Sequence, residues 1–252
     1  MDLSAAFNMT PEEAVAYLRS KGYAVSHNWW EVWQEANAKA FTVAKAARED
    51  ILTLIKTEIE QSLKDGTTQQ QFIDRLRPQL EKAGWWGKQI IVDSEGDAES
   101  VQLGSPRRLQ TIYRTNQAVA YARARYQRQF QVGKHRPYWK YIAVMDSRTR
   151  PSHSALHGRV FRYDDPIWDI IYPPNGWGCR CGVITYSQRQ LDREGLKVES
   201  GASYIQRIKA EAGVDKKTGE VIEVDHARIN LPGGQVMEPD VGWAYNPAKE
   251  AA

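Results

Sequence analysis

Apolar residues recur every three or four positions over a long stretch in the first third of the chain, a spacing typical of an amphipathic helix. The stretch starts near Asn28 or Trp29 and ends near Lys64, where Asp65-Gly66 closes it. We interpret it as one long core helix of a bundle rather than a free coiled coil. Its apolar seam consists of Trp29, Trp33, Ala36, Ala40, Val43, Ala47, Ile51, Leu54, Ile55, Ile59 and Leu63.

Start and stop signals predict three further helices in the first half of the chain. Thr10-Pro11 with two following acids begins a short helix that ends before Gly22. Thr67 or Thr68 caps the next helix, which runs to about residue 83 and is interrupted by Pro78. Ser105-Pro106 begins the last one, which ends near residue 131. The glycine-rich loop between these two helices, residues 84–104, contains a short strand at 89–92.

After Gly133 the pattern changes to short strands and turns. Residues 138–144 and 182–186 have strand character, a helix begins at Ser187, and another is expected around 202–212. Residues 231–252 show little periodicity, and we interpret them as an extended arm that becomes ordered on a partner or as a disordered tail. The predicted class is α+β: a mainly helical region (1–100) with the long amphipathic helix, a small mixed α/β module (101–190), and a C-terminal helix with an extended tail (191–252).

Positive charge is concentrated in one short part of the chain. Residues 100–145 contain nine lysines and arginines and no aspartate or glutamate, although the whole chain has a net charge of only +3. At 100° per residue, four arginines of the helix that begins at Pro106 fall on one face, opposite an apolar face: Arg107, Arg114, Arg125 and Arg128. This face is either a solvated surface paired with acids of the N-terminal half or a contact for DNA or another polyanion.

The module contains a candidate metal-ligand set. His153 and His157 are four residues apart, so one helical turn would direct both imidazoles the same way. Cys179 and Cys181 are two apart, so a strand would place both thiols on one face. Two histidines and two cysteines form a tetrahedral ligand set of the structural zinc type, and Asp146 is a candidate fifth ligand. The alternative is that the histidines are hydrogen bonded and the cysteines fill a core.

The chain lacks the motifs of common enzymes. His153 and His157 have the spacing of a zinc peptidase helix, but the glutamate that would act as general base is missing. No nucleophile elbow, phosphate-binding loop or dinucleotide fingerprint occurs. We therefore expect no enzymatic activity, with a metal-dependent hydrolase as the alternative. No apolar run is long enough to span a bilayer, no secretory signal is seen, and two cysteines cannot build a disulfide framework, so we expect synthesis in a cytoplasm.

The stretch from about Leu109 to Thr185 resembles the phage Mu F-like minor head protein (head morphogenesis) family. The resemblance rests on Ile112-Tyr113-Arg114-Thr115-Asn116, on Asp146-Ser147-Arg148-Thr149-Arg150-Pro151 with His153, Leu156 and Gly158, on Asp164-Asp165-Pro166, and on Tyr172-Pro173-Pro174-Asn175-Gly176-Trp177-Gly178-Cys179-Arg180-Cys181. The segment Gly242-Trp243-Ala244-Tyr245-Asn246-Pro247 resembles a terminal motif of many members.

This resemblance implies a structural protein of the phage particle. It implies a minor head protein that lies inside the capsid near the portal and acts in head assembly and in DNA packaging or ejection. The implied partners are the portal protein, other head proteins and packaged DNA. A DNA-binding module without sequence specificity is the second hypothesis, and the arginine face is compatible with both. The family carries no established catalytic residue over to this chain, so the metal question rests on the ligand set alone.

Overall fold

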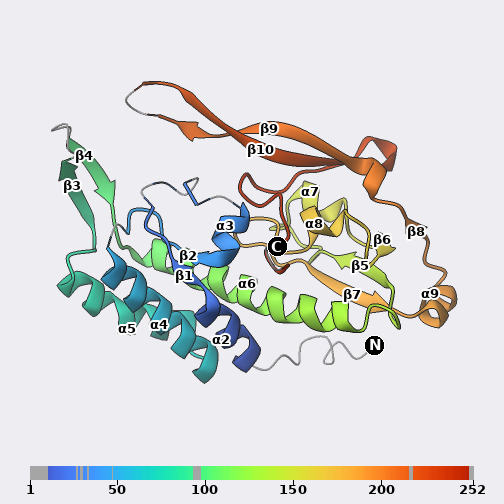
Figure 1. Cartoon of the computed structure of the whole chain (residues 1–252), viewed down its shortest axis with the longest axis horizontal. Helices are drawn as coiled ribbons and strands as arrows, with labels where there is room; N and C mark the ends of the chain where they lie inside the picture. Colours follow the sequence, from blue (N-terminus) through green and yellow to red (C-terminus); the bar gives the residue numbers. More distant parts are fainter. Residues whose placement is uncertain are drawn as a thin grey trace. The chain divides into compact units, whose positions relative to one another are not determined.

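The computed structural model describes residues 11–26, 28, 31–32, 34–46, 48–92, 98–215 and 218–249. Contacts divide the chain into two compact units. We call the part from Thr10 to Ala120 the helical unit and the part from Tyr121 onward the sheet unit; the boundary falls within helix α6 (Pro106–Gln131). Figure 1 shows helices and several small sheets along the chain, which confirms the predicted α+β class.

The helical unit is built around α2 (Pro11–Ser20), α4 (Glu49–Asp65), α5 (Gln69–Lys82) and the first part of α6. α4 ends at Gly66, whose left-handed backbone (φ 63°) suits a residue without a side chain. The predicted cap of α5 is confirmed at Thr68, which forms a capping box with Gln71. Fully buried aliphatic and aromatic side chains fill the core of this unit, among them Leu18, Ile51, Ile55, Ile59, Leu63, Phe72, Leu76, Leu80 and Leu109.

The prediction of one continuous helix from residue 28 to Lys64 is wrong. The described part of that segment contains α3 (Gln34–Lys39), strand β2 (Ala40–Phe41), and a connection in which Lys45 has a φ of 62° before α4 begins at Glu49. β2 pairs in parallel with β1 (Gly22–Tyr23). Phe41 and Val43 are both buried, a spacing of two that requires extended backbone. Trp29, Trp33 and Ala47 of the predicted seam lie outside the described residues.

Two smaller predictions in this unit had different outcomes. Pro78 does not interrupt α5, which continues to Lys82 with Leu76 and Leu80 buried on either side of the proline. The single backbone hydrogen bond that proline removes is offset by this packing. The predicted strand at 89–92 is confirmed as β3 (Lys88–Val92), which pairs in antiparallel fashion with β4 (Ala98–Gln102).

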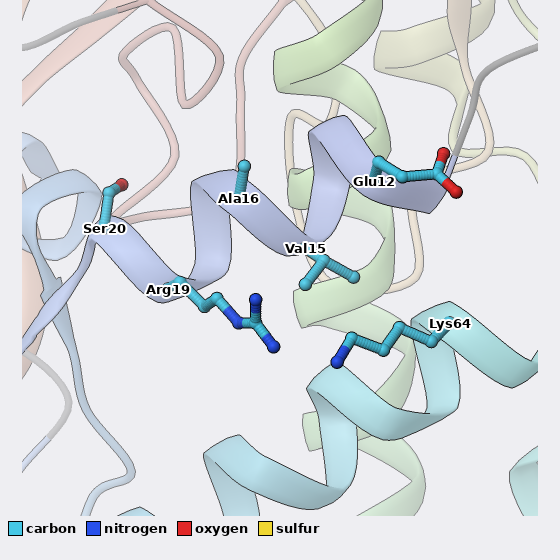
Figure 2. A pocket seen from close by; sticks show the side chains of 6 residues that line it. All are labelled: Glu12, Val15, Ala16, Arg19, Ser20 and Lys64. Atoms are coloured by element: carbon cyan, nitrogen blue, oxygen red, sulfur yellow. The ribbon is translucent and has the colours of Figure 1, made fainter.

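A hollow of about 660 Å³ opens between α2 and α4. Figure 2 shows Val15 and Arg19 of α2 and Lys64 of α4 directed toward the same space. Arg19 already donates to Glu60 of α4 at 2.9 Å, so this ion pair joins the two helices across part of the hollow. The lining contains one acid and two cations without a buried nucleophile or ligand cluster, and the candidate site lies in the sheet unit instead.

The sheet unit contains a four-stranded sheet in the order β7 (Gly182–Tyr186), β5 (Tyr138–Ile142), β6 (Val160–Arg162), β8 (Val198–Glu199). The predicted strands at 138–144 and 182–186 and the helix after Ser187, α9 (Gln188–Glu194), are confirmed, β5 ending at Ile142. The core of the sheet unit contains a cluster of aromatic rings among a larger number of aliphatic side chains. The ring of Trp139 lies 5.8 Å from that of Tyr126 in α6 and 5.5 Å from that of Trp168 in α8 (Trp168–Ile171). These contacts join the second part of α6 to the sheet.

The predicted helix at 202–212 is wrong. A short 3-10 turn, η1 (Ala202–Tyr204), leads into strand β9 (Ile205–Val214), which forms a long ribbon with β10 (Val221–Asn230) (Figure 1). Ile208, Ala210 and Ala212 alternate with charged residues, a period of two that fits a strand. β11 (Val236–Met237) adds two residue pairs to β10.

The C-terminal tail is irregular as expected, but it does not project as an arm. Between Leu231 and Lys249, a 3-10 turn, η2 (Pro232–Gly234), and β11 are the regular elements that the structure describes. Leu231, Met237, Ala244 and Ala248 are buried in the aromatic core of the sheet unit. The tail is therefore part of this core. None of the helices in the described ranges is long and apolar enough to cross a membrane.

Candidate metal centre

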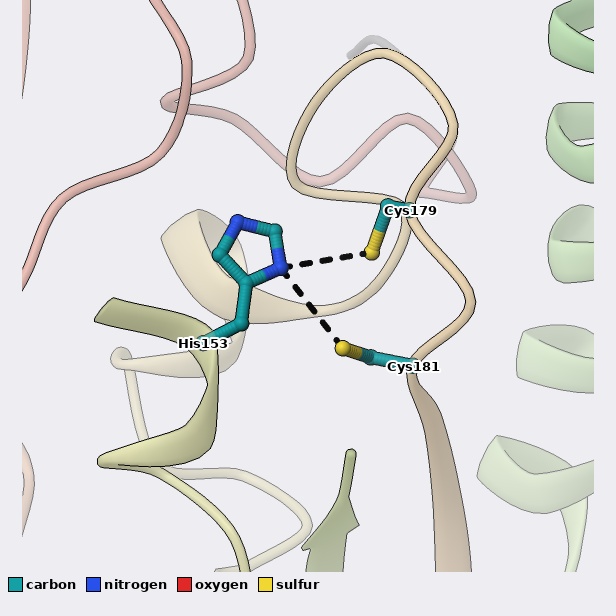
Figure 3. Close-up of side chains that lie close together, drawn as sticks. All are labelled: His153, Cys179 and Cys181. Atoms are coloured by element: carbon teal, nitrogen blue, oxygen red, sulfur yellow. Dashed lines mark hydrogen bonds between the residues drawn. The ribbon is translucent and has the colours of Figure 1, made fainter. Parts of the chain in front are cut away.

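Three of the five residues predicted as metal ligands come together in the sheet unit. His153 lies in α7 (Pro151–Ser154), a single turn that begins with proline after Arg150. Cys179 and Cys181 lie on the segment that leads into β7. Figure 3 shows one ring nitrogen of His153 directed at both sulfur atoms. Among the described residues, this is the cluster of histidine, cysteine or acidic side chains with metal-binding proximity.

The distances between these atoms suit a tetrahedral ion. Nδ1 of His153 is 3.6 Å from Sγ of Cys179 and 3.6 Å from Sγ of Cys181. Zinc bonds of about 2.05 Å to nitrogen and about 2.3 Å to sulfur at a tetrahedral angle keep those atoms about 3.6 Å apart. The three ligand atoms all lie within 4.8 Å of one another. The donor set therefore fits zinc, with one tetrahedral position left for a further ligand.

The electrostatics of the cluster favour a thiolate, the form of cysteine that binds metals. The Cys181 thiol hydrogen bonds to Cys179 and, together with His153, lowers the pKa of Cys179 to about 4 against the cost of burial. The same interaction and burial raise the pKa of Cys181, because the second proton leaves a site that already holds a negative charge. The thiol of Cys179 therefore loses its proton more easily than the thiol of Cys181 does.

Buried polar residues surround the cluster. The hydroxyl group of Tyr141 donates to Oδ1 of Asn175 at 2.8 Å, and both side chains are fully buried. Burial and the nearby cysteines raise the pKa of Tyr141 well above its usual value, so it stays protonated and donates. Nε2 of His153 is also buried and has no hydrogen-bond partner in the described part of the chain. The ring is consequently held by its Nδ1 contacts and by packing.

The loop that carries Cys179 is fixed by Asp240, a residue of the C-terminal tail. Oδ2 of Asp240 accepts hydrogen bonds from the backbone N–H of Trp177 at 3.0 Å and from Arg150 at 2.8 Å. Arg150 also donates to the carbonyl oxygen of Trp177 at 2.9 Å. A side chain at Gly176 would lie 2.3 Å from the Asp240 carboxylate, so only glycine allows this approach. Asp240 and Arg150 thereby position both the loop and the start of α7.

His157 and Asp146 do not join the cluster. α7 ends at Ser154, so the helical turn that would align His157 with His153 is not formed. His157 is exposed, and its Nδ1 accepts the backbone N–H of Ala143 at 3.1 Å. Asp146 is held by two hydrogen bonds from Arg180 at 2.8 and 2.6 Å, and Arg180 keeps the pKa of this carboxyl well below its usual range. The Asp146–Arg180 pair links the loop after β5 to the residue between the two cysteines.

The four arginines predicted to form one face of α6 have different surroundings. Arg107 and Arg114 belong to the helical unit and are exposed, and Arg114 donates to Oε1 of Gln69 at 2.7 Å. Arg125 and Arg128 belong to the sheet unit and are half-buried. Arg125 lies against β7, where a side chain at Gly182 would come within 3.4 Å of its guanidinium. The two units thus use this helix face differently, and the DNA contact stays a prediction.

Sequence reasoning missed the residues that hold the cluster in place. Arg150, Tyr141, Asn175 and Asp240 were not selected as site residues, because each acts through a partner far away in the chain. A signal for two of them was present: Asn175 and Arg150 stand inside the quoted family motifs. Asp240 lies two residues before Gly242, where the terminal motif Gly242–Pro247 begins, and no local pattern indicated that this part of the tail lies beside the cluster.

The fold and the cluster together define a class of protein: an α+β module in which a long helix packs on a small sheet and a His-Cys-Cys cluster joins the loops beside it. The chain belongs to the Phage Mu protein F like family, whose model matches residues 53–184, slightly more than half of the chain. The matched region includes all three residues of the cluster.

Several curated proteins are similar to the chain. It is 49% identical over its full length to the putative capsid assembly protein F of Escherichia phage Mu, and 46% identical over 88% of its length to the Mu-like prophage FluMu F protein of Haemophilus influenzae. It covers 57% and 52% of these two relatives, so it spans little more than half their length. An uncharacterized protein of Methanocaldococcus jannaschii is 30% identical over 45% of the chain and 17% of its own length. No solved structure is significantly similar.

Proposed function

We propose that this chain acts in assembly of the head of a Mu-like bacteriophage. The observation that carries the proposal is the 49% identity, over the whole chain, to a protein named for capsid assembly. Identity at this level preserves the fold and the residues that hold it. Because the chain spans 57% of that relative, the proposal concerns the part of the assembly function that resides in the matched half.

The finer form of the proposal is a minor head protein inside the capsid near the portal. In this form it contacts the portal protein and other head proteins and acts during DNA packaging or ejection. A module with a partly buried His-Cys-Cys cluster and a tail packed into its core suits a part that must keep its shape against neighbouring subunits. The resemblance described from the sequence motifs implies this location.

We propose that His153, Cys179 and Cys181 hold a structural zinc ion. Such an ion would join α7 to the segment before β7, and the two 3.6 Å separations support it. When bound, zinc would supply a tetrahedral cross-link between α7 and the segment before β7. For hydrolysis a base beside the ion would also be needed, and Asp146 is bound to Arg180 instead. A structural role is thus better supported than a metal-dependent hydrolase.

A genetic experiment tests the assembly function. The gene that encodes this chain is deleted from the phage that carries it, and the phage is complemented with the wild-type gene or with a Cys179→Ser variant. We expect infectious particles to be lost without the gene and restored by the wild type. Electron microscopy of the lysate would reveal absent or malformed heads, and cross-linking of purified heads would join the chain to the portal protein. Normal infectious heads without the chain would refute the assembly function.

A second candidate function, contact with DNA, is favoured by one specific observation. Residues 100–145 contain nine basic and no acidic residues, and Arg107 and Arg114 within this segment are exposed. Replacing both with glutamine should weaken DNA binding equally for all sequences and reduce its salt dependence. Arg125→Gln, which alters a half-buried arginine, is the matched control. Binding that is unaffected by the double replacement would remove this function.

A further inference from the structure

The ribbon formed by β9 and β10 has an unpaired edge. β9 is the last strand of its sheet, in which β11, β10 and β9 follow one another. Among the described residues, no backbone hydrogen bond joins the outer edge of β9 to another element. Ten residues, Ile205–Val214, thus present a row of backbone donors and acceptors to a further strand (Figure 1).

The charges along this edge are not balanced within the ribbon. Lys209 lies opposite Asp225 of β10, and their side chains form an ion pair of 2.7 Å. Two positions further on, Glu211 lies directly opposite Glu223. Like charges at directly opposite positions repel each other, and both carboxylates are exposed on the same face of the ribbon. Glu211 therefore lacks the cation that Lys209 supplies to Asp225.

We propose that a second copy of this chain pairs with β9 in antiparallel orientation, with Ala210 of each copy at the twofold axis. In this register Lys209 of one copy lies opposite Glu211 of the other, and the same contact occurs twice by symmetry. Each Glu211 thereby gains a lysine neighbour, so the second copy supplies the charge that the ribbon lacks. Backbone hydrogen bonds of a continuous six-stranded sheet, three strands from each copy, would cover both free edges.

Charge also selects this register over its neighbours. An axis at Lys209 would place the two Lys209 side chains opposite each other, and an axis at Glu211 would do the same with two carboxylates. The axis at Ala210 places a residue without charge opposite itself and leaves no like-charge pair across the new junction. A shift of the pairing by one residue would place charged residues of one copy opposite apolar residues of the other, because neighbouring residues of a strand point to opposite faces.

The opposite face of the ribbon supports the same pairing. Ile208 and Ala210 point to one side of β9 and are half-buried, whereas Arg207, Lys209 and Glu211 are exposed on the other side; the buried Ala212 falls at an irregularity of the ladder and has no partner in β10. Pairing about Ala210 places Ile208 of one copy opposite Ala212 of the other. The side of each ribbon that carries Ile208 and Ala210 thus continues into that of its partner, with Gln206 opposite Val214 at either end of the junction.

A charge exchange tests the proposal on the full chain. Glu211→Lys places lysines opposite each other across the junction, but within the ribbon it relieves the repulsion with Glu223, so the fold is not weakened. Lys209→Glu creates the reverse charge pattern. The double variant Lys209→Glu, Glu211→Lys restores opposite charges at every junction pair. Glu223→Lys makes the same charge change on β10 and supplies Glu211 with a cation within the ribbon, but it places no like charge at the junction.

Self-association is measured by sedimentation equilibrium over a wide range of concentration. We expect the wild-type chain to dimerise. Glu211→Lys should raise the dissociation constant of the dimer about thirtyfold, because it turns the two attractive Lys209–Glu211 pairs of the junction into repulsive ones. The double variant should dimerise like the wild type. Glu223→Lys, which gives Glu211 a lysine within its own ribbon, should raise the dissociation constant less than Glu211→Lys does. The two single variants, Glu211→Lys and Lys209→Glu, should each be monomeric alone and should associate when mixed, because one supplies two lysines and the other two glutamates.

A disulfide provides an independent test of the register. In Ala210→Cys the two new thiols would face each other across the axis, at an antiparallel Cα separation of about 4.5 to 5.5 Å that a disulfide can bridge. In Arg207→Cys the equivalent thiols would be about 20 Å apart and should not cross-link. A monomeric wild-type chain at every concentration would overturn the proposal, as would a dimer that all charge variants retain. Because association is measured on purified protein, its failure leaves the head-assembly function, which is tested in the phage, untouched.

Discussion

The helical unit is held mainly by aliphatic side chains, whereas the sheet unit adds a cluster of aromatic rings, buried polar contacts and the His-Cys-Cys cluster to an aliphatic core. In α4 the buried residues follow a helical repeat, and the helix ends at capping residues. In the sheet unit the loops around Cys179 are fixed by a carboxylate from the C-terminal tail, Asp240, and by His153 from a single helical turn. The helix ends of the helical unit are thus fixed by residues nearby in the sequence, whereas the loops of the sheet unit are fixed by residues far apart.

This difference teaches which perturbations each unit should resist. Loss of one aliphatic contact in the helical unit leaves a cavity of limited size, since neighbouring turns remain packed. Loss of one ligand in the sheet unit releases several loops at once, since α7 and the segment before β7 share the same cluster. The following predictions separate the two units by changing one and measuring both.

Removal of a cluster cysteine should have the largest effect. We expect purified wild-type protein to contain about one equivalent of zinc, and Cys179→Ser to lose the metal and several kcal/mol of stability in the sheet unit. Hydrogen exchange resolved by peptide should accelerate in residues 138–186 and remain unchanged in α4 and α5. Ser154→Ala, on the same helical turn as His153, is the control and should behave as the wild type. A metal-free wild type with slow exchange in both units would refute the zinc site.

Replacement of Lys21 should raise the stability of the helical unit, whereas replacement of Cys179 should lower that of the sheet unit. Burial, with a smaller contribution from Lys56, lowers the pKa of Lys21 from 10.5 to about 8. Between these values the unfolded chain binds more protons than the folded chain, so the stability of the unit should rise with pH from about 8 to 10.5. At neutral pH the buried charge costs about 3 kcal/mol. Lys21→Met should therefore stabilise the unit at pH 7 by up to about that amount and flatten its pH dependence.

The neighbouring Lys56 is the control for this prediction. Its ammonium group donates to the carbonyl oxygens of Lys21 at 2.5 Å and of Arg19 at 3.4 Å, at the C-terminal end of α2. Lys56→Met removes these hydrogen bonds and should destabilise the same unit by about 2 kcal/mol. Denaturant unfolding at pH 7 and pH 10 measures whether each variant is more or less stable than the wild type. Destabilisation by Lys21→Met at pH 7 would show that its contact with Tyr17 outweighs the cost of burial.

Asp240 tests whether the tail acts on the cluster from a distance. Asp240→Asn keeps the size of the side chain but weakens its bonds to Arg150 and to the N–H of Trp177. Asp240 and Arg150 are partly exposed, so we expect a loss of about 1 kcal/mol. Zinc affinity should fall about tenfold or more, as for other residues that orient ligands. Asp169→Asn, which removes an exposed pair with Lys249, should leave the affinity unchanged.

Elements that depend on local signals could be predicted from the sequence. Thr68, Pro106 and Ser187 mark the beginnings of α5, α6 and α9, and the structure has all three helices there. The predictions failed where distant residues decide the conformation. Ala40 and Val43 continue a helical repeat in the sequence, but the pairing of β2 with β1 extends this segment. Residues 202–212 contain no glycine or proline that would mark a turn, so a helix is predicted there. Their pairing with β10, which is a contact with a later part of the chain, makes most of them a strand.

The candidate site divides in the same way. The spacing of Cys179 and Cys181 alone predicted that their thiols lie together, because residues two apart on extended backbone share a face. The histidine spacing was misleading, since a single-turn helix of four residues cannot carry His157 to the side of His153. Asp240 lies about sixty residues beyond Cys179, and no pattern in the sequence connects the two. Such contacts follow from the packing of the tail, which the sequence indicated only as irregular.

The smallest expected effect compares the same capping motif in the two units. Thr68 and Ser187 each form a capping box with a glutamine three residues later. Thr68→Ala should cost the helical unit about 1 kcal/mol, because four buried residues of α5 couple its first turn to the core. Ser187→Ala should mainly loosen α9 itself, because Leu191 is its one buried residue among those described. Denaturant unfolding and hydrogen exchange distinguish these outcomes: a global loss of stability in both variants would mean that α9 is coupled to the sheet core as firmly as α5 is to its own.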